Sequence, residues 1–237
     1  MQVLGSILFS MMVILNTIVF GLVCCFLVFF PFHTRAKYAR PYAQFNVWLL
    51  KVLCGVRYEI FGRENIPDSG SYIVFSNHQS TWDTFIAQLI FPPISFVVKK
   101  ELLYMPIFGW VLAIFKPIAI KRSSGRIALK QLITQGIARL KDNIIVMIYP
   151  EGTRIPPDTK TEFKKGGAIL AEKSGYPVVP IALNAGYYWP KGGFFKKRGL
   201  ITVHIGKPIV SEGRKAKDIM FDAESFITSH IESAHYE

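Results

Sequence analysis

Acidic side chains are scarce in this chain of 237 residues, which has 16 Asp and Glu residues against 28 Lys and Arg residues. The net charge of +12 favours a polyanionic partner. The mean hydropathy is nevertheless +0.30, and nucleic-acid-binding proteins seldom combine such charge with such apolar character. A chain that is both basic and apolar is typical of proteins that bind anionic lipid.

Cysteine is also scarce. The three cysteines, Cys24, Cys25 and Cys54, all lie in or beside apolar N-terminal segments, and their spacing is not that of metal ligands. This pattern argues against a zinc site and against a disulfide framework. Four of the five histidines have no convincing ligand partner either, so no metal is expected.

Charge is missing altogether from residues 3–32, an apolar stretch longer than the ~20 residues that a membrane-spanning helix needs. A secretory signal would be shorter and would have early basic residues and a small-residue cleavage site, so we interpret this stretch as a retained anchor. Arg35, Lys37 and Arg40 follow it and place the rest of the chain on the cytoplasmic side. The compact length favours a bacterial inner membrane.

The next stretch, Tyr42 to Val56, is apolar with Lys51 in its middle. It can lie among lipid headgroups, return as the second arm of a hairpin in one leaflet, or pack as an ordinary helix on the soluble core. The sequence leaves these alternatives open. We therefore predict a membrane-anchoring helical segment at residues 1–56 and one catalytic domain at residues 57–237.

Beyond residue 56, short apolar runs alternate with helical stretches, which predicts an α/β fold with a mixed sheet flanked by helices. A helix is expected over residues 126–140 with Ile127, Ile133, Ile137 and Leu140 facing inward, and another over residues 215–234. The predicted strands are 58–61, 72–75, 95–98, 117–120, 144–149, 178–183 and 201–205.

The most informative segment runs from Asn77 to Asp83 and follows one of these apolar runs. His78 and Asp83 flank a predicted strand-to-helix turn, so Asp83 could accept a hydrogen bond from one ring nitrogen of His78 while the other removes a proton from a hydroxyl. The alternative is an ordinary helix N-terminus with Asp83 in its first turn.

The chain lacks a Gly-x-Ser-x-Gly elbow, and its cysteines lie far from this segment. The hydroxyl that His78 would activate is therefore expected to belong to the substrate. Two rival hypotheses remain: a membrane hydrolase that uses Ser76 or Ser80 with His78, and a lipid-binding adaptor without enzymatic activity.

Basic residues follow the ends of three further apolar runs. Arg154 lies with Glu151 in the turn of residues 149–154, and the pairs Lys99-Lys100 and Lys121-Arg122 each end a run. Ligand crevices form at the carboxyl ends of α/β strands, so these cations are candidates for an anion site. A surface turn and solvated charges would give the same pattern.

Taken together, these motifs resemble the glycerolipid acyltransferases, the family that includes 1-acyl-sn-glycerol-3-phosphate acyltransferases. Tyr149 stands where that family usually has Phe, and Lys121 where it often has Asp. The resemblance rests on four ordered blocks: Asn77-His78 through Asp83; Lys99 to Leu102 with Pro106, Gly109 and Arg122; Tyr149 to Arg154; and Pro177 to Ala182.

The resemblance implies transfer of a fatty acyl group from acyl-CoA or acyl-carrier protein to the sn-2 hydroxyl of lysophosphatidic acid, without a cofactor. A related enzyme acting on glycerol 3-phosphate or another lysophospholipid is the alternative. The last block would shape the acyl site. The implied catalytic residues are His78 and Asp83, and the implied acceptor-binding residues are Lys99, Lys100, Arg122, Glu151, Gly152, Thr153 and Arg154.

A loop at residues 186–198 interleaves aromatic and basic side chains. We interpret it as a segment that dips into the membrane surface, where aromatics favour the interface and cations favour anionic headgroups. The alternative is a surface loop that packs on the core.

Overall fold

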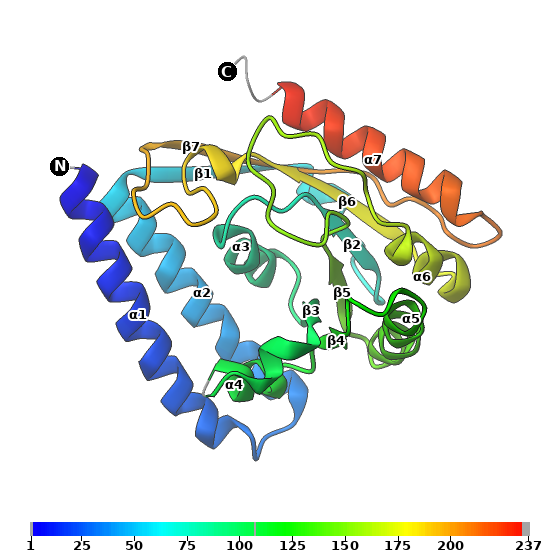
Figure 1. Ribbon diagram of the computed structural model, residues 1–237, viewed down its shortest axis with the longest axis horizontal. Coiled ribbons are helices and arrows are strands. Elements are labelled where there is room, and N and C mark those ends of the chain that lie inside the picture. Colours follow the sequence, from blue (N-terminus) through cyan, green and yellow to red (C-terminus); the bar gives the residue numbers. More distant parts are fainter. Residues whose placement is uncertain (1, 107, 234–237) are drawn as a thin grey trace.

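The computed structural model describes residues 2–106 and 108–233, in which seven strands form one mixed sheet (Figure 1). The strand order is β1-β7-β6-β2-β5-β3-β4, and every neighbouring pair is parallel except β6 and β7. All the predicted strands are present, and the α/β fold class is confirmed. The strands are β1 Val56–Phe61, β2 Ile73–Ser76, β3 Ile94–Lys99, β4 Ile118–Ile120, β5 Ile145–Ile148, β6 Val178–Leu183 and β7 Gly199–Ile205.

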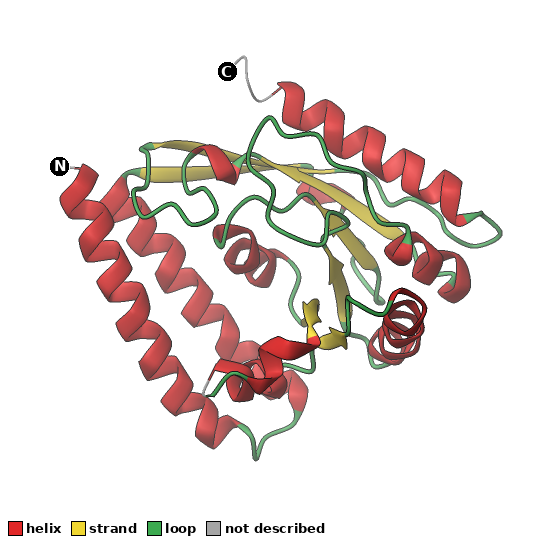
Figure 2. Cartoon of the chain, in the orientation of Figure 1, coloured by secondary structure: helices red, strands yellow, loops and turns green. Residues whose placement is uncertain are grey.

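Helices cover both faces of the sheet, with α1 to α4 on one side and α5 to α7 on the other (Figure 2). Three 3-10 helices lie in the connections. The helices are α1 Gln2–Leu27, α2 Phe32–Cys54, α3 Trp82–Ile90, α4 Phe108–Ile114, α5 Gly125–Lys141, α6 Gly166–Ser174 and α7 Ala216–Ser233, with η1 Arg63–Asn65, η2 Lys100–Tyr104 and η3 Ala185–Tyr187.

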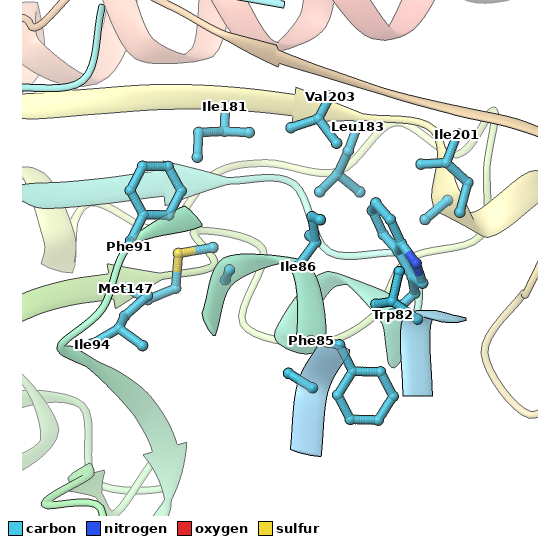
Figure 3. Close-up of a cluster of buried hydrophobic side chains, with 14 of the residues drawn as sticks. Trp82, Phe85, Ile86, Phe91, Ile94, Met147, Ile181, Leu183, Ile201 and Val203 are labelled. Carbon is cyan, nitrogen blue, oxygen red and sulfur yellow. The ribbon is translucent and has the colours of Figure 1, made fainter. Parts of the chain in front are cut away.

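The sheet separates two hydrophobic cores, because successive side chains of a strand point to opposite faces. On β5, Ile145 and Met147 belong to the core under α2 and α3, whereas Val146 and Ile148 belong to the core under α5 to α7. Both faces of the central strands are buried, which explains their unbroken apolar runs. Figure 3 shows the first core, where Trp82, Phe85 and Ile86 of α3 pack with Met147, Ile181, Leu183, Ile201 and Val203.

Several helices differ from the prediction. The apolar run at residues 3–32 is not one helix, because α1 ends at Leu27 and a turn leads through Pro31 into α2. On α5 the buried positions are Leu132, Gly136 and Leu140, one per helical turn, whereas Ile127 is exposed. The prediction is confirmed for Leu140, which is buried, and for Ile137, which packs against the second core, and it is wrong for Ile127.

Helices α4 and α6 were not predicted. Helix α6 begins with Gly166 and Gly167, and glycine has a low helix propensity. Tertiary packing requires the small residue, because a Cβ atom at Gly167 would lie 2.7 Å from Cζ of Phe75. A Cβ atom on Gly136 of α5 would likewise lie 2.6 Å from Cδ2 of Leu170.

Helices α1 and α2 form an antiparallel hairpin along one flank of the molecule (Figure 1). The second arm belongs to the first core through Val47, Leu49 and Leu50. It also exposes Phe45 and Trp48, so the segment from Tyr42 packs on the core and presents aromatic surface at the same time.

The hairpin contacts the domain near both ends of α1. Towards the N-terminus, Phe9 makes an edge contact with Trp189 at a ring distance of 5.1 Å, and Ser6 Oγ accepts a hydrogen bond of 2.9 Å from the Lys196 amide. Further along, Phe20 stacks on Tyr42 and Phe115. The first helix therefore lies along the domain rather than projecting from it.

Candidate active site

The loop that carries His78 connects β2 to α3, as the sequence predicted, and hydrogen bonds hold its main chain. The side chain of Asn77 donates from Nδ2 to the Leu183 carbonyl at 2.7 Å and accepts at Oδ1 from the Leu183 backbone amide at 3.0 Å. The Ile155 amide donates to the His78 carbonyl at 2.7 Å. Gln79 Oε1 accepts from the Gly186 amide at 3.1 Å. The loop is thus fixed to segments more than 70 residues away in sequence.

His78 and Asp83 form the predicted pair, with 2.8 Å between Nδ1 and Oδ2. The same carboxylate oxygen accepts two further hydrogen bonds of 2.8 Å, from the amides of Gln79 and Ser80. An oxygen with two amide donors is an acceptor, so Nδ1 of His78 carries the proton and Nε2 is left as the base. Asp83 is fully buried, whereas 16% of the His78 side chain is exposed.

The ring of Tyr149 stacks on the imidazole of His78, with centroids 3.9 Å apart and planes inclined by 15°. Burial raises the pKa of the Tyr149 hydroxyl well above its ordinary value, and the charges of Asp83 and Glu151 raise it further. The phenol therefore stays neutral. Its flat face limits the rotation of the base.

Glu151 binds the main chain of His78: its Oε2 accepts a hydrogen bond of 2.8 Å from the His78 amide. Burial raises the pKa of Glu151 to about 8, while the hydrogen bond from His78 acts in the opposite direction and Asp83 adds to the rise. The side chain is 8% exposed and does not line the cavity described next. The resemblance implied that Glu151 belongs to the acceptor-binding turn. In the structure its carboxylate binds the backbone amide of His78 instead.

A cavity of about 1110 Å³ lies in front of His78. Helices α1 to α4 contribute apolar side chains to its lining, including Phe20 and Tyr42, and Phe115 follows α4. Basic side chains line the cavity as well. Among the predicted acceptor-binding residues, those that line the cavity are Lys99, Arg122, Gly152, Thr153 and Arg154. Lys100 opens η2, is exposed and is not part of the lining.

Both arginines are held by the turn and by the helix beside it. Arg122 donates from Nη1 to the Gly152 carbonyl, and Arg154 donates from Nη1 to Thr81 Oγ1 at 2.8 Å. Burial lowers the pKa of Arg122, which still lies far above neutrality as for any arginine. Lys164 also lines the cavity, and the sequence analysis did not predict it. The one local signal was the run Lys164-Lys165-Gly166-Gly167, in which a basic pair precedes two glycines.

Two sequence-based hypotheses change in the light of this geometry. Ser76 donates to the Asn77 carbonyl at 2.9 Å, and Ser80 accepts from the Trp82 amide at 3.2 Å, so both hydroxyls are buried and bonded elsewhere. This arrangement does not support a serine hydrolase. The strand β6 does not line the cavity as expected for the acyl site. It supports the His78 loop through Leu183 instead.

Comparisons with known proteins identify the family of this chain. A family model described as Acyltransferase matches residues 57–184. The chain is 44% identical over 220 residues to the 1-acyl-sn-glycerol-3-phosphate acyltransferase of Pseudomonas aeruginosa, covering 92% of this chain and 85% of the relative. It is 35% identical over 170 residues to the enzyme of that name from Saccharomyces cerevisiae, covering 69% of this chain and 55% of that relative.

The same fold occurs in the crystal structure of the 1-acyl-sn-glycerophosphate (LPA) acyltransferase PlsC from Thermotoga maritima. The TM-score is 0.81 at 23% sequence identity, and the match covers 100% of this chain and 97% of the other. Fold, family model and close relatives therefore agree. The chain belongs to the glycerolipid acyltransferase family, whose members include these 1-acyl-sn-glycerol-3-phosphate acyltransferases.

Proposed function

We propose that this protein transfers a fatty acyl group from an acyl thioester to the sn-2 hydroxyl of lysophosphatidic acid and forms phosphatidic acid. One observation carries the proposal: a His78–Asp83 pair opens onto a cavity that is lined by both basic and apolar side chains. The basic side chains fit the phosphate of the acceptor, and the apolar side chains fit an alkyl chain. The 44% identical relative carries the name of this activity.

In this mechanism Nε2 of His78 removes the proton of the acceptor hydroxyl as its oxygen attacks the thioester carbonyl. The tetrahedral intermediate collapses with cleavage of the carbon–sulfur bond, and His78 returns the proton to the thiolate. Asp83 stabilises the imidazolium between the two steps. A positioned base of this kind contributes roughly 10²- to 10⁴-fold in rate. All proton transfers run through His78, so the reaction requires no cofactor.

Phosphate binding is assigned to Lys99, Arg122 and Arg154. Arginine presents a planar fork that matches phosphate oxygens, and both arginines are fixed in place by hydrogen bonds of their own. Lys99 is preferred over Lys100 because only the former lines the cavity. The thioester donor is acyl-CoA or acyl-carrier protein, both of which are acidic and suited to a basic protein.

We also propose that α1 and α2 bind one leaflet of the membrane. Helix α1 is long and apolar enough to cross a bilayer by length and composition alone. A spanning helix, however, would have to leave the domain, and α1 contacts it near both ends. The hairpin exposes many large apolar side chains, among them Leu4, Met11, Ile14, Leu22, Phe26, Phe29 and Trp48.

The loop at residues 186–198 supports the same orientation. Its tip exposes Phe194 and Phe195 beside the N-terminal part of α1, whereas Lys196 is buried against Phe9 and Trp189. The loop therefore packs on the core with one part and offers aromatic surface with another. We place the protein at the cytoplasmic face of a bacterial inner membrane, in line with the basic residues that follow α1.

The test is acyl transfer by the purified full chain in mixed micelles, with acyl-CoA or acyl-carrier protein as the labelled donor. The acceptors are lysophosphatidic acid, glycerol 3-phosphate and lysophosphatidylcholine, and the control is His78→Ala. We expect His78-dependent transfer to lysophosphatidic acid. Transfer to another acceptor alone would correct the substrate, and near-normal turnover by a folded His78→Ala variant would refute the mechanism.

A further inference from the structure

The side chain of Lys164 lies across the turn that carries Gly152. A Cβ atom built on Gly152 would lie 2.7 Å from Nζ of Lys164 and 3.3 Å from its Cε. The main chain is tied to the same turn, because the Lys164 amide donates to the Pro150 carbonyl at 2.9 Å. Gly152 has a positive φ of 74°, so this position favours glycine for its backbone as well as for the space that the lysine occupies.

Lys164 opens onto the same cavity as the catalytic base. It lines this cavity together with His78, Arg122 and Arg154. Arg122 contacts Gly152 through the carbonyl oxygen, whereas the Lys164 side chain occupies the space that a Cβ atom at this position would need. Cations from two different segments, one before α5 and one before α6, therefore meet at one residue.

Lys164 forms no ion pair with any residue in the described part of the chain. The nearest acidic residue in the turn is Glu151, which is buried and bonded to the His78 amide. Because burial raises the pKa of Glu151 to about 8, its carboxyl group is mostly neutral at pH 7. The carboxylate whose charge acts on the neighbouring Arg122 is that of Glu101, and no ion pair among the described residues includes Lys164.

We propose that Lys164 is a further binding residue for the phosphate monoester of the acceptor, together with Arg122 and Arg154. The inference rests on the proposed function and adds a residue that the motifs do not contain. A phosphate monoester carries about −1.5 to −2 charges at pH 7 and three acceptor oxygens, so it can engage several cations at once. The flexible lysine adapts its position as a point charge, while the arginines fix the phosphate geometry.

Lys165 provides a matched control. It is the next residue in the chain and is also exposed, but it does not line the cavity. The experiment compares Lys164→Met and Lys165→Met as purified full chains in mixed micelles. The readouts are kcat and KM for lysophosphatidic acid, for acyl-CoA, and for monoacylglycerol, which has the acceptor hydroxyl but no phosphate. Thermal unfolding of each variant monitors the fold.

For Lys164→Met we expect the KM for lysophosphatidic acid to rise about tenfold, as for loss of one charge-assisted hydrogen bond. The ratio of kcat/KM for lysophosphatidic acid to that for monoacylglycerol should fall by the same factor. Both quantities should stay at wild-type values in Lys165→Met, and Lys164→Arg should restore most of the loss.

Three outcomes would overturn the assignment: equal behaviour of the two Met variants, an equal loss with both acceptors, or a KM increase for acyl-CoA alone. The last result would indicate that Lys164 binds the phosphates of acyl-CoA rather than the phosphate of the acceptor. Each of these requires a wild-type protein that acylates lysophosphatidic acid. If the wild type transfers no acyl group to it, the proposed function itself has failed.

Discussion

The carboxyl group of Glu151 holds the His78 loop by its backbone, because Oε2 accepts a hydrogen bond of 2.8 Å from the amide of His78. This bond joins two segments that are 73 residues apart in the chain. The residue before Glu151 in the same turn is Pro150, and the residue after it is Gly152, which contacts Lys164 and Arg122. One short turn therefore positions both the base and the cations.

We predict that Glu151→Gln keeps most of the activity and that Glu151→Ala loses it. The amide oxygen of glutamine can accept the same hydrogen bond from His78, whereas alanine leaves that buried amide without its partner. The measurement is kcat for both folded variants, and we expect Glu151→Ala to fall at least tenfold. Inactive Glu151→Gln would instead indicate that the ionised carboxylate takes part in the reaction.

Glu151 should also make stability depend on pH. Its pKa is raised from 4.5 to about 8 in the folded protein, so between these values the folded state binds a proton that the unfolded state has released. The stabilisation is fully present below pH 4.5 and is lost as the pH rises towards 8. Thermal unfolding between about pH 5 and 8 should show a smaller decline in Tm for Glu151→Gln than for wild type. Parallel curves would contradict the assignment.

Arg154 should act mainly on acceptor binding. Replacement by Ala removes a planar phosphate ligand and should raise the KM for lysophosphatidic acid about tenfold or more. The side chain also bonds to Thr81 at 2.8 Å, so Thr81→Val is the control that removes this internal contact and keeps the cation. Equal KM values for wild type and Arg154→Ala would remove the phosphate role, and an equal effect of Thr81→Val would assign the effect to packing.

The proposed membrane orientation predicts different environments for two exposed phenylalanines. Phe194 lies beside α1 and is 50% exposed, and Phe221 lies on α7 and is 69% exposed. A nitroxide label at Phe194→Cys should be relaxed by oxygen dissolved in the bilayer, and one at Phe221→Cys by a water-soluble nickel complex. The background is Cys25→Ser, since Cys25 is the exposed cysteine among those described. The same accessibility at both sites would refute the orientation.

The positions of the central strands could be predicted because β2, β5 and β6 are short, apolar and buried on both faces. Val178–Leu183, for example, is buried at every position and reads as one unbroken run. Helix α6 could not be predicted, since its two initial glycines are explained only by their contacts with Phe75 and with Leu132 of α5. The turn between α1 and α2 was hidden for a similar reason: the apolar residues continue through it.

The sequence by itself determined the His78–Asp83 pair, because both residues lie in one strand-to-helix turn whose local geometry brings them together. It also determined that the chain is both basic and apolar. The tertiary structure decided which cations reach that cavity, selecting Lys99 over Lys100 and adding Lys164. It also turned Glu151 inward to the main chain of His78. These contacts depend on the order of the strands, in which β2 lies between β5 and β6, and no local pattern of residues encodes that order.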